Sequence, residues 1–266
     1  MTLSGAELWS PEHPKLYTCE VSFGDDQALE SFGIRSLSWG AEGLCLNGQR
    51  ILLQGACVHH DNGILGARCF PEAEERKVIL LKKAGFNAVR SAHNPCSKAF
   101  LDACDRLGML VLDEFADQWY IPKTKYDYTR YFAAWWREDL RAMVEKDDNH
   151  PSVIMYSIGN EVSETAREEG VQWTDTMVKY IRELDGSRPV TCGVNLFFND
   201  LSAKGLGVYS EKKAKKAKGN QHVGSQFFNA LAGLLGQEFM KRGAVLPGCD
   251  RNTRDAYARL DVAGYN

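Results

Sequence analysis

Asn160 and Glu161 are the residues with the clearest chemical potential, because they follow an apolar, β-rich run over residues 153–158 after a single glycine. That run is typical of a strand buried on both faces, and residues 165–184 have the spacing of an amphipathic helix. A carboxylate at the end of a parallel strand occupies the position where (β/α) barrels gather their catalytic residues. The alternative is that Glu161 only caps the helix, since glutamate suits a helix N-terminus. The neighbouring amide of Asn160, which a cap does not need, favours the catalytic interpretation.

Four other predicted strands also end in polar groups that do not suit a buried core. Any one of these groups is ordinarily a loop residue with local hydrogen bonds. Because the C-terminal ends of parallel strands lie at one face of a barrel, the whole set predicts a polar pocket for a neutral, hydroxyl-rich ligand such as a sugar. The residues are His59, His60 and Asp61; Arg90, His93 and Asn94; Asp113 and Glu114, with Asp117 and Trp119 just beyond; and Tyr265 and Asn266.

A metal site is the weaker interpretation of these side chains. Adjacent His59 and His60 cannot both face inward on one strand, and no H-E-x-x-H motif is present. The sequence also has no G-x-G-x-x-G and no Walker A motif. We therefore expect neither a metal nor a cofactor.

From residue 51 onward the sequence predicts alternating strands and helices, and these elements would position the polar residues named above. Repeated strand–helix units indicate a parallel sheet flanked by helices, and six such strands are predicted. The strands are expected at residues 51–59, 88–93, 110–115, 153–161, 189–195 and 261–266, and the helices at 71–84, 97–107, 131–147, 165–184 and near 227–241.

The first 38 residues have a different pattern. Residues 16–23 alternate like a half-buried antiparallel strand, a turn signal follows, and residues 28–37 form a second β-like run with a bulge or bend expected at Gly33. Residues 44–50 then predict a tight hairpin that turns at Asn47-Gly48. Two or three strands do not make a domain, so we expect the last part of a β-sandwich here.

Composition and charge exclude several classes of protein. The net charge is −3, and no apolar run approaches the roughly 20 residues of a membrane span. The N-terminus has no signal-peptide pattern, and the eight cysteines form no C-x-x-C pair, which favours reduced thiols and a cytoplasmic location. Residues 204–219 hold six lysines without interleaved aromatic residues, so a solvated, mobile loop is favoured over a nucleic-acid patch.

Five motifs resemble the family 2 glycoside hydrolases, the β-galactosidase and β-glucuronidase group. They are LWSPEHPKLY (8–17), FGIR (32–35), LNGQRILLQGACVHHD (46–61), GFNAVRSAHNP (85–95) and HPSVIMYSIGNE (150–161). The resemblance implies a (β/α)8 TIM-barrel catalytic domain over residues 39–266, incomplete at about six βα units. It also implies that residues 1–38 are the C-terminal part of an immunoglobulin-like β-sandwich.

The resemblance also implies roles for individual residues. Glu161 matches the general acid/base, and Asn160 matches the residue that binds the sugar 2-hydroxyl. Tyr265 matches a sixth-strand tyrosine that hydrogen-bonds the nucleophile. The other matched residues line the sugar subsite or the loop after the third strand: His59, Arg90, His93, Asp113, Asp117 and Trp119.

The second carboxylate of a retaining glycosidase should lie only ~5 Å from the acid/base. In the family it ends the seventh barrel strand, and this chain ends on the sixth. Glu114, Glu164 and Glu238 are not in a position to replace it. We therefore expect a central fragment of a longer enzyme that is inactive when isolated.

The expected function is hydrolysis of terminal β-glycosides by a β-galactosidase-like retaining enzyme, with a carbohydrate as the substrate and no nucleic acid or membrane as a partner. A β-glucuronidase of the same family and a non-catalytic carbohydrate-binding remnant are the alternatives. Homo-oligomerisation stays open.

Overall fold

The structure is a computed structural model that describes residues 4–216, 233 and 238–266. The chain divides into two compact units, each built from three segments. The first unit comprises Met1–Glu114, Ala142–Tyr156 and Asp185–Pro189. The second comprises Phe115–Arg141, Ser157–Leu184 and Val190–Asn266.

Six strands form one sheet in the order β11-β10-β9-β8-β7-β6. The pairs β6–β7, β7–β8 and β10–β11 are parallel. All eight residues of β9 are buried, as its apolar run predicts. The predicted TIM-barrel fold with about six βα units is confirmed. The strands are β6 (Gly55–Val58), β7 (Ala88–Ser91), β8 (Leu110–Glu114), β9 (Val153–Asn160), β10 (Val190–Val194) and β11 (Gly264–Tyr265).

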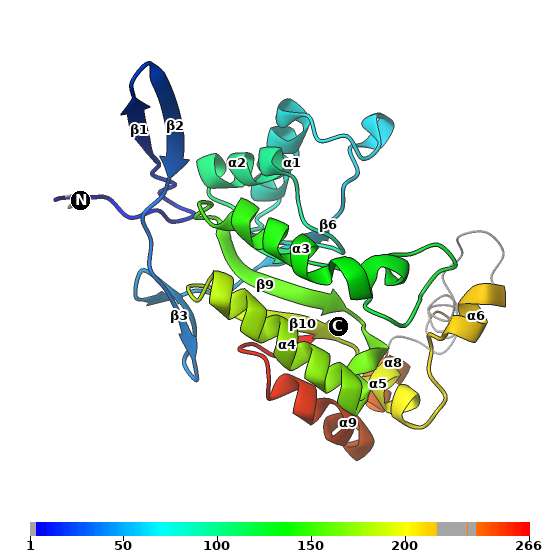
Figure 1. Ribbon diagram of the computed structural model, residues 1–266. Coiled ribbons are helices and arrows are strands. Elements are labelled where there is room, and N and C mark those ends of the chain that lie inside the picture. Colours follow the sequence, from blue (N-terminus) through cyan, green and yellow to red (C-terminus); the bar gives the residue numbers. More distant parts are fainter. Residues whose placement is uncertain (1–3, 217–232, 234–237) are drawn as a thin grey trace. The chain divides into compact units, whose positions relative to one another are not determined.

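Two helices of the first unit, α1 (Pro71–Lys83) and α2 (Lys98–Leu107), lie side by side (Figure 1). Helix α1 begins with proline at its first position, which suits a residue without an N–H. The Ser97 hydroxyl caps α2 by accepting from the Phe100 amide. Helix α2 ends at Gly108, whose φ of +74° is left-handed. A short 3₁₀ turn, η1 (Gly63–Leu65), precedes α1.

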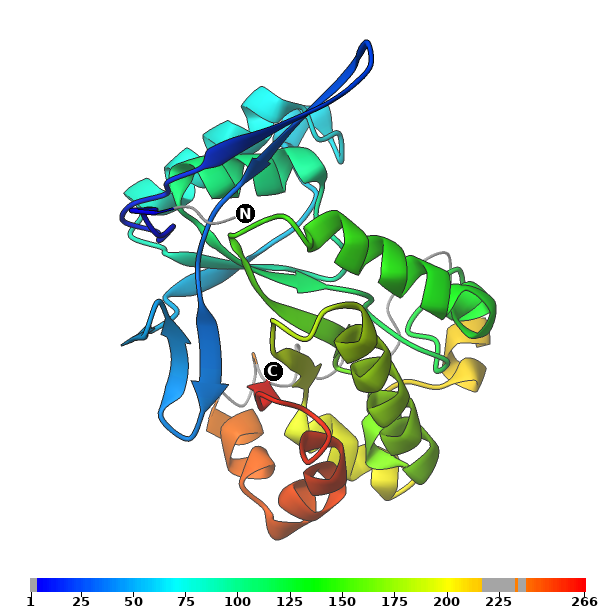
Figure 2. The ribbon, with the colours of Figure 1, turned by 60° about the vertical axis from the view of Figure 1, so that its left-hand side comes forward.

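The N-terminal strands form two small antiparallel sheets in the same unit. Strands β1 (Tyr17–Phe23) and β2 (Asp26–Phe32) make a two-stranded ribbon (Figure 2). The second strand was expected to continue to residue 37, but β2 ends at Phe32, just before Gly33; a Cβ on Gly33 would lie 2.6 Å from Cγ of Pro151. The second sheet consists of β3 (Leu37–Gly40), β4 (Gly43–Leu46) and β5 (Gln49–Arg50). Its last two strands are joined by the predicted Asn47-Gly48 turn, in which both residues have positive φ.

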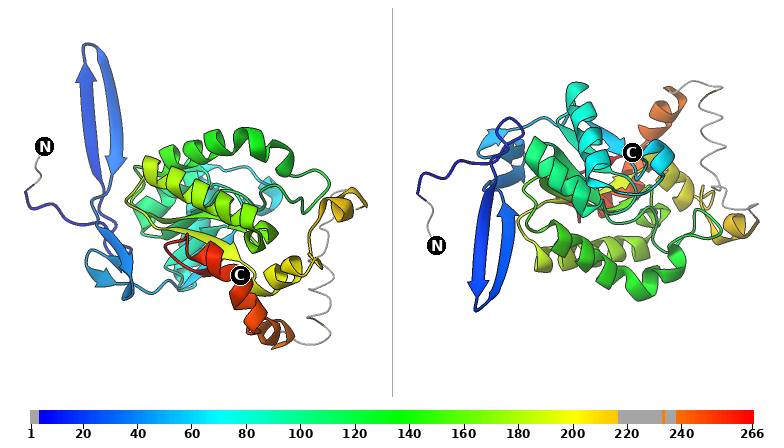
Figure 3. Two further views of the ribbon diagram at one scale, coloured as in Figure 1. Left: turned by 60° about the horizontal axis from the view of Figure 1, so that its bottom comes forward. Right: turned by 90° about the horizontal axis from the view of Figure 1, so that it is seen from above.

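Helix α3 (Thr129–Asp147) runs from the second unit into the first, and the remaining helices of the described residues belong to the second unit. They are η2 (Ser163–Ala166, a 3₁₀ turn), α4 (Glu168–Leu184), α5 (Leu196–Ala203), α6 (Glu211–Lys216), α8 (Glu238–Ala244) and α9 (Pro247–Tyr257). Helices α5 and α9 pack against each other (Figure 3). No helix in the described part of the chain has the length and apolar character of a membrane span.

Several sequence-based boundaries are wrong. The lysine-rich run was expected to be a loop, but residues 211–216 form α6, in which Lys215 pairs with Glu211 at 2.6 Å, one helical turn apart. Helices α5 and α9 were not predicted. Most of the helix expected near residues 227–241 lies outside the described residues, although α8 covers its end. Helix α4 starts at Glu168 rather than at residue 165 because η2 occupies the intervening turn.

Candidate active site

Arg90, which is partly exposed, and the buried Glu114 form a forked ion pair at the ends of β7 and β8, within the first unit. Nη2 of Arg90 lies 2.8 and 3.0 Å from the two carboxylate oxygens, and Nε lies 3.0 Å from Oε2. Nδ1 of His93 is 3.1 Å from Oε1 of the same carboxylate, and the His59 and His93 rings meet edge-on at 5.4 Å. Burial alone would lower the pKa of the Arg90 guanidinium, but the charge of Glu114 outweighs it and the pKa is raised. Two of the predicted residues, Arg90 and His93, therefore contact Glu114, and a third, His59, joins them through its contact with His93.

Asp113 is not part of this group. Successive side chains of a strand point to opposite faces, so Asp113 faces away from Glu114. Its Oδ1 accepts from the Cys96 amide at 2.9 Å, and its Oδ2 lies 3.1 Å from Nζ of Lys146 on α3. Lys146 also contacts Asp147, whose pKa is raised well above its ordinary value by burial and then by the charge of Asp113. Asp113 thus holds α3 to the sheet, and the inward acid of this strand is Glu114.

In the second unit, Asn160 belongs to a bonded group with Asp117 and Lys123. Nδ2 of Asn160 donates to Oδ1 of Asp117 at 2.8 Å, which fixes the orientation of the amide. The Lys123 ammonium donates to the same oxygen at 2.8 Å and to the Asn160 carbonyl at 2.6 Å. Lys123 is a buried cation that compensates Asp117 and holds the end of β9.

Glu161 has a left-handed backbone, with φ of +46°. Only a small fraction of non-glycine residues adopt this conformation, and such residues gather at functional sites. Its amide donates to the Gly193 carbonyl at 2.6 Å, which fixes the turn beyond β9. One carboxylate oxygen, Oε1, accepts from Nδ2 of Asn195 at 2.8 Å, and the other lies 3.2 Å from the Tyr209 hydroxyl.

Trp119 and Tyr265 differ in their surroundings. Trp119 is fully buried: its ring stacks on Phe132 at 6.5 Å and its Nε1 donates to the Ile158 carbonyl at 2.8 Å. Trp119 is therefore a core residue, and its bond to Ile158 ties it to β9. Tyr265, on β11, is largely exposed and its ring meets Tyr257 at 5.4 Å.

Lys123, Asn195 and Tyr209, whose side chains bond to Asp117 or Glu161, were not found from the sequence. Asn195 ends a predicted strand, so the rule that selected the other polar strand ends would have found it. Tyr209 lies in a segment that was expected to be a loop, and neither it nor Lys123 carries a periodic signal.

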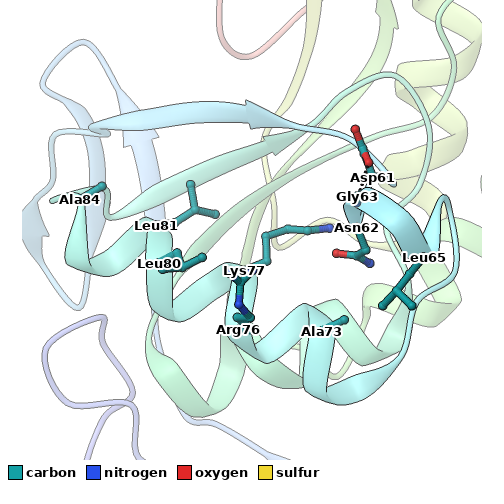
Figure 4. A pocket seen from close by; sticks show the side chains of 10 residues that line it. All are labelled: Asp61, Asn62, Gly63, Leu65, Ala73, Arg76, Lys77, Leu80, Leu81 and Ala84. Atoms are coloured by element: carbon teal, nitrogen blue, oxygen red, sulfur yellow. Dashed lines mark hydrogen bonds between the residues drawn. The ribbon is translucent and has the colours of Figure 1, made fainter.

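A separate cavity of about 480 Å³ lies in the first unit, between the η1 loop and α1. Figure 4 shows Lys77 reaching from α1 toward the loop that carries Asn62, while Asp61 accepts from the Gly63 amide at 2.9 Å. Leu80 and Leu81 of α1 form an apolar part of the wall of this cavity.

Within the described residues, one group has the side chains of a metal site: Asp102, Asp105 and His150, whose ligand atoms lie within 4.8 Å of one another. Asp105 already accepts from the Ser152 amide at 3.0 Å and lies 2.5 Å from Nδ1 of His150. We therefore interpret this group as a structural link between α2 and the start of β9, in which Asp105 bonds to His150 and Ser152.

The chain matches two models of one protein family. "Glycosyl hydrolases family 2, TIM barrel domain" matches residues 40–230, and "Glycosyl hydrolases family 2" matches residues 1–35. The boundary predicted at residue 38 stays a prediction.

Three proteins illustrate the similarity. A β-galactosidase of Bacteroides ovatus is 36% identical over 232 residues, which cover 73% of this chain and 27% of that protein. The crystal structure of a glycosyl hydrolase family 2 member from Bacteroides cellulosilyticus has a TM-score of 0.74 and 40% identity, over 98% of this chain and 28% of that one. The structure of a β-D-glucuronidase for Dictyoglomus thermophilum has a TM-score of 0.63 and 27% identity, over 71% and 34%. The chain thus spans between about a quarter and a third of the length of these relatives.

Proposed function

The chain belongs to family 2 of the glycosyl hydrolases, and we propose that it carries the general acid/base of a retaining β-glycosidase of the β-galactosidase type, with Glu161 in that role. The observation that carries the proposal is the setting of Glu161. Its carboxyl group stands at the C-terminal end of a fully buried parallel strand, on a left-handed residue, with a hydrogen-bonding side chain at each oxygen.

The proposed reaction is a double displacement. Neutral Glu161 gives its proton to the glycosidic oxygen as the bond to the sugar breaks, while a second carboxylate forms a bond to the sugar. The Glu161 carboxylate then takes a proton from the water that releases the sugar. Asn160, held by Asp117, would bind a sugar hydroxyl, and His59, Arg90 and His93 would line the sugar subsite.

Two further roles are also proposals. Tyr265 would hydrogen-bond the second carboxylate, and Asp117 would contribute to the pocket through its hold on Asn160. Asp113 and Trp119 have buried structural partners, so we propose that they support the site without touching the sugar.

A β-glucuronidase is the second candidate, because a solved β-glucuronidase shares this fold and sequence pattern. A uronate carboxylate needs a cation, and Lys123 is committed to Asp117 and the Asn160 carbonyl. The galactoside is the first candidate because the β-galactosidase of Bacteroides ovatus is more similar to this chain, at 36% identity, than the solved β-glucuronidase is, at 27%.

The test is Glu161→Gln in the full-length protein, assayed on β-galactosides and β-glucuronides with poor and with activated aryl leaving groups. General acid assistance is worth about 10²–10⁴-fold, so kcat/KM, which reports the step that forms the glycosyl–enzyme bond, should fall by that factor for poor leaving groups and by much less for activated ones. Glu168→Gln, an exposed glutamate at the start of α4, is the matched control. Equal losses on all substrates would contradict the role of Glu161, and absence of any turnover by the wild-type protein would favour a non-catalytic carbohydrate-binding protein.

The 266-residue chain alone should not turn over either substrate. Double displacement needs a second carboxylate ~5 Å from the first. In the second unit Glu164 is buried and bonded to the Tyr120 and Ile121 amides, and Glu238 is exposed on α8. Turnover well above that of the chain's own Glu161→Gln variant would show that another carboxylate serves.

A further inference from the structure

The segment that follows β10 brings two side chains to the carboxyl group of Glu161. Nδ2 of Asn195 lies 2.8 Å from Oε1, and the Tyr209 hydroxyl lies 3.2 Å from Oε2. All three residues belong to the second unit. The two oxygens of one carboxyl group therefore have chemically different partners.

The orientation of the Asn195 amide is determined by the helix that it caps. Asn195 is the N-cap of α5, and its Oδ1 accepts from the Phe198 amide at 3.1 Å. A backbone N–H can only donate, so Oδ1 must face Phe198 and the NH₂ group must face Glu161. Because that group is also only a donor, it favours the carbonyl form of Oε1, which accepts better than the O–H oxygen of a neutral acid, and so it favours placing the proton of neutral Glu161 on Oε2.

The Tyr209 ring is held firmly at the other oxygen. Only 4% of the residue is exposed, and its ring meets Phe198 edge-on at 6.2 Å. The Lys123 ammonium lies 5.1 Å from the ring centroid, in a cation–π contact. A phenol can accept a hydrogen bond from a neutral acid and donate one to a carboxylate, so its hydroxyl suits both states of Oε2.

We propose that Asn195 and Tyr209 are positioning residues that assign the proton of Glu161 to Oε2. The inference rests on the proposed acid/base role of Glu161. In the first step the Oε2–H bond breaks, and its proton passes to the glycosidic oxygen as the bond from that oxygen to the sugar breaks. The resulting carboxylate accepts from Asn195 at Oε1 and from Tyr209 at Oε2. In the second step Oε2 takes a proton from water as the water oxygen bonds to the sugar and the bond from the sugar to the second carboxylate breaks.

The test uses Tyr209→Phe and Asn195→Ser in the full-length protein. Phenylalanine keeps the ring and removes the hydroxyl, and serine keeps a good N-cap and removes the amide donor. Misplacement of the acid should lower kcat/KM for poor leaving groups on the order of 10- to 100-fold and leave activated aryl substrates much less affected. Each variant removes a donor to the charged carboxylate, and a bond to the charged form is stronger than one to the neutral acid, so the alkaline limb of the pH profile of kcat/KM should move to higher pH. Tyr180→Phe, at a ring that packs on Trp136, is the control and should change neither quantity.

Asn195→Asp separates positioning from helix capping. Aspartate caps a helix as well as asparagine does, but it presents a negative acceptor to Oε1 instead of a donor. If Asn195 positions the proton, this variant should lose more activity on poor leaving groups than Asn195→Ser does, with a larger shift of the alkaline limb. If capping is its only role, Asn195→Ser, which keeps the cap and adds no charge, should resemble the wild type.

The outcomes distinguish this inference from the proposed function. If Glu161→Gln shows the leaving-group dependence and the Tyr209 and Asn195 variants do not, the acid/base role stands and the positioning role is overturned. If Glu161→Gln lacks that dependence, the proposed function falls and the inference falls with it.

Discussion

At the scale of single residues, the Arg90–Glu114 pair makes a direct test of buried charge. The side chains are 19% and 0% exposed, so removing the arginine leaves a desolvated carboxylate. Breaking a buried pair from one side costs about 3–5 kcal/mol, and we expect Arg90→Met to lower the free energy of unfolding by that amount in urea titrations at neutral pH. Arg106→Met is the matched control, because Arg106 pairs with Glu75 at 2.9 Å on the surface, where such pairs are worth about 0–1 kcal/mol. Similar losses for the two variants would contradict this account.

Glu164 gives a pH-dependent prediction at the same scale. Burial raises its pKa above 4.5, and the Ile121 and Tyr120 amides that it accepts from offset this only in part. Above pH 4.5 the folded chain therefore holds a proton that the unfolded chain releases, and this contribution to stability is lost as pH rises through the folded-state pKa. A glutamine side chain at this position would keep an acceptor oxygen for both amides but cannot ionise. Urea titrations should show Glu164→Gln gaining stability relative to the wild type between pH 4.5 and 8; a difference that does not change with pH would refute the assignment.

The candidate site residues show how far single positions can be predicted. Arg90 and His93 contact the Glu114 carboxylate and the His59 ring contacts His93, and all three were among the polar strand ends that the sequence predicted to form one pocket. The choice between Asp113 and Glu114 depends on which strand face points inward, and adjacent acids give no hydropathy contrast to decide it. Trp119 was placed in the pocket because it follows a polar strand end, yet its indole stacks on Phe132 in the core. Tyr209 needs tertiary packing to reach Glu161, and no local pattern encodes that.

At the scale of elements, prediction succeeded where capping and periodicity agree. Helix α2 has a serine N-cap and a left-handed glycine at its end, and its bounds were predicted to within a residue. Helices α5 and α9 were not predicted. In α5 the polar residues Asn199, Asp200 and Ser202 are buried, so the helix lacks the regular apolar spacing of an amphipathic helix. The bounds of a helix are therefore predicted well when local interactions, such as its caps, stabilise it, and poorly when packing against the rest of the protein does.

The glycine that ends α2 provides a prediction at this scale. Gly108 has φ of +74°, and a Cβ there would overlap the Pro11 carbonyl group, whose carbon would lie 2.9 Å away. Gly85, which follows α1, has φ of +88° but open space around it. A left-handed non-glycine residue costs about 1–3 kcal/mol, so Gly85→Ala should lose that much and Gly108→Ala clearly more, measured as free energies of unfolding. Equal losses would mean that the contact with Pro11 yields without cost.

At the scale of the whole molecule, strands β6 and β11 are the outer strands of the described six-stranded sheet. Each has a hydrogen-bonding edge that no other described strand of that sheet covers. The ribbon of β1 and β2 likewise exposes apolar side chains, including Phe23 at 86%. Other large apolar side chains are exposed at Leu52, Ile64 and Leu80 of the first unit. Uncovered strand edges and apolar surfaces of this kind promote association.

We therefore expect the 266-residue chain, expressed alone, to self-associate. Sedimentation velocity over a hundredfold range of concentration should show species larger than the monomer that grow with concentration, and thermal unfolding should be broad and irreversible. If the ribbon contributes, Phe23→Ser combined with Leu29→Ser should reduce association, because it removes exposed apolar area without changing buried contacts. Lys98→Ser, at an exposed charged position of α2, is the control and should have no effect. A monodisperse monomer with a sharp, reversible melt would show that the exposed strand edges and apolar side chains do not drive association.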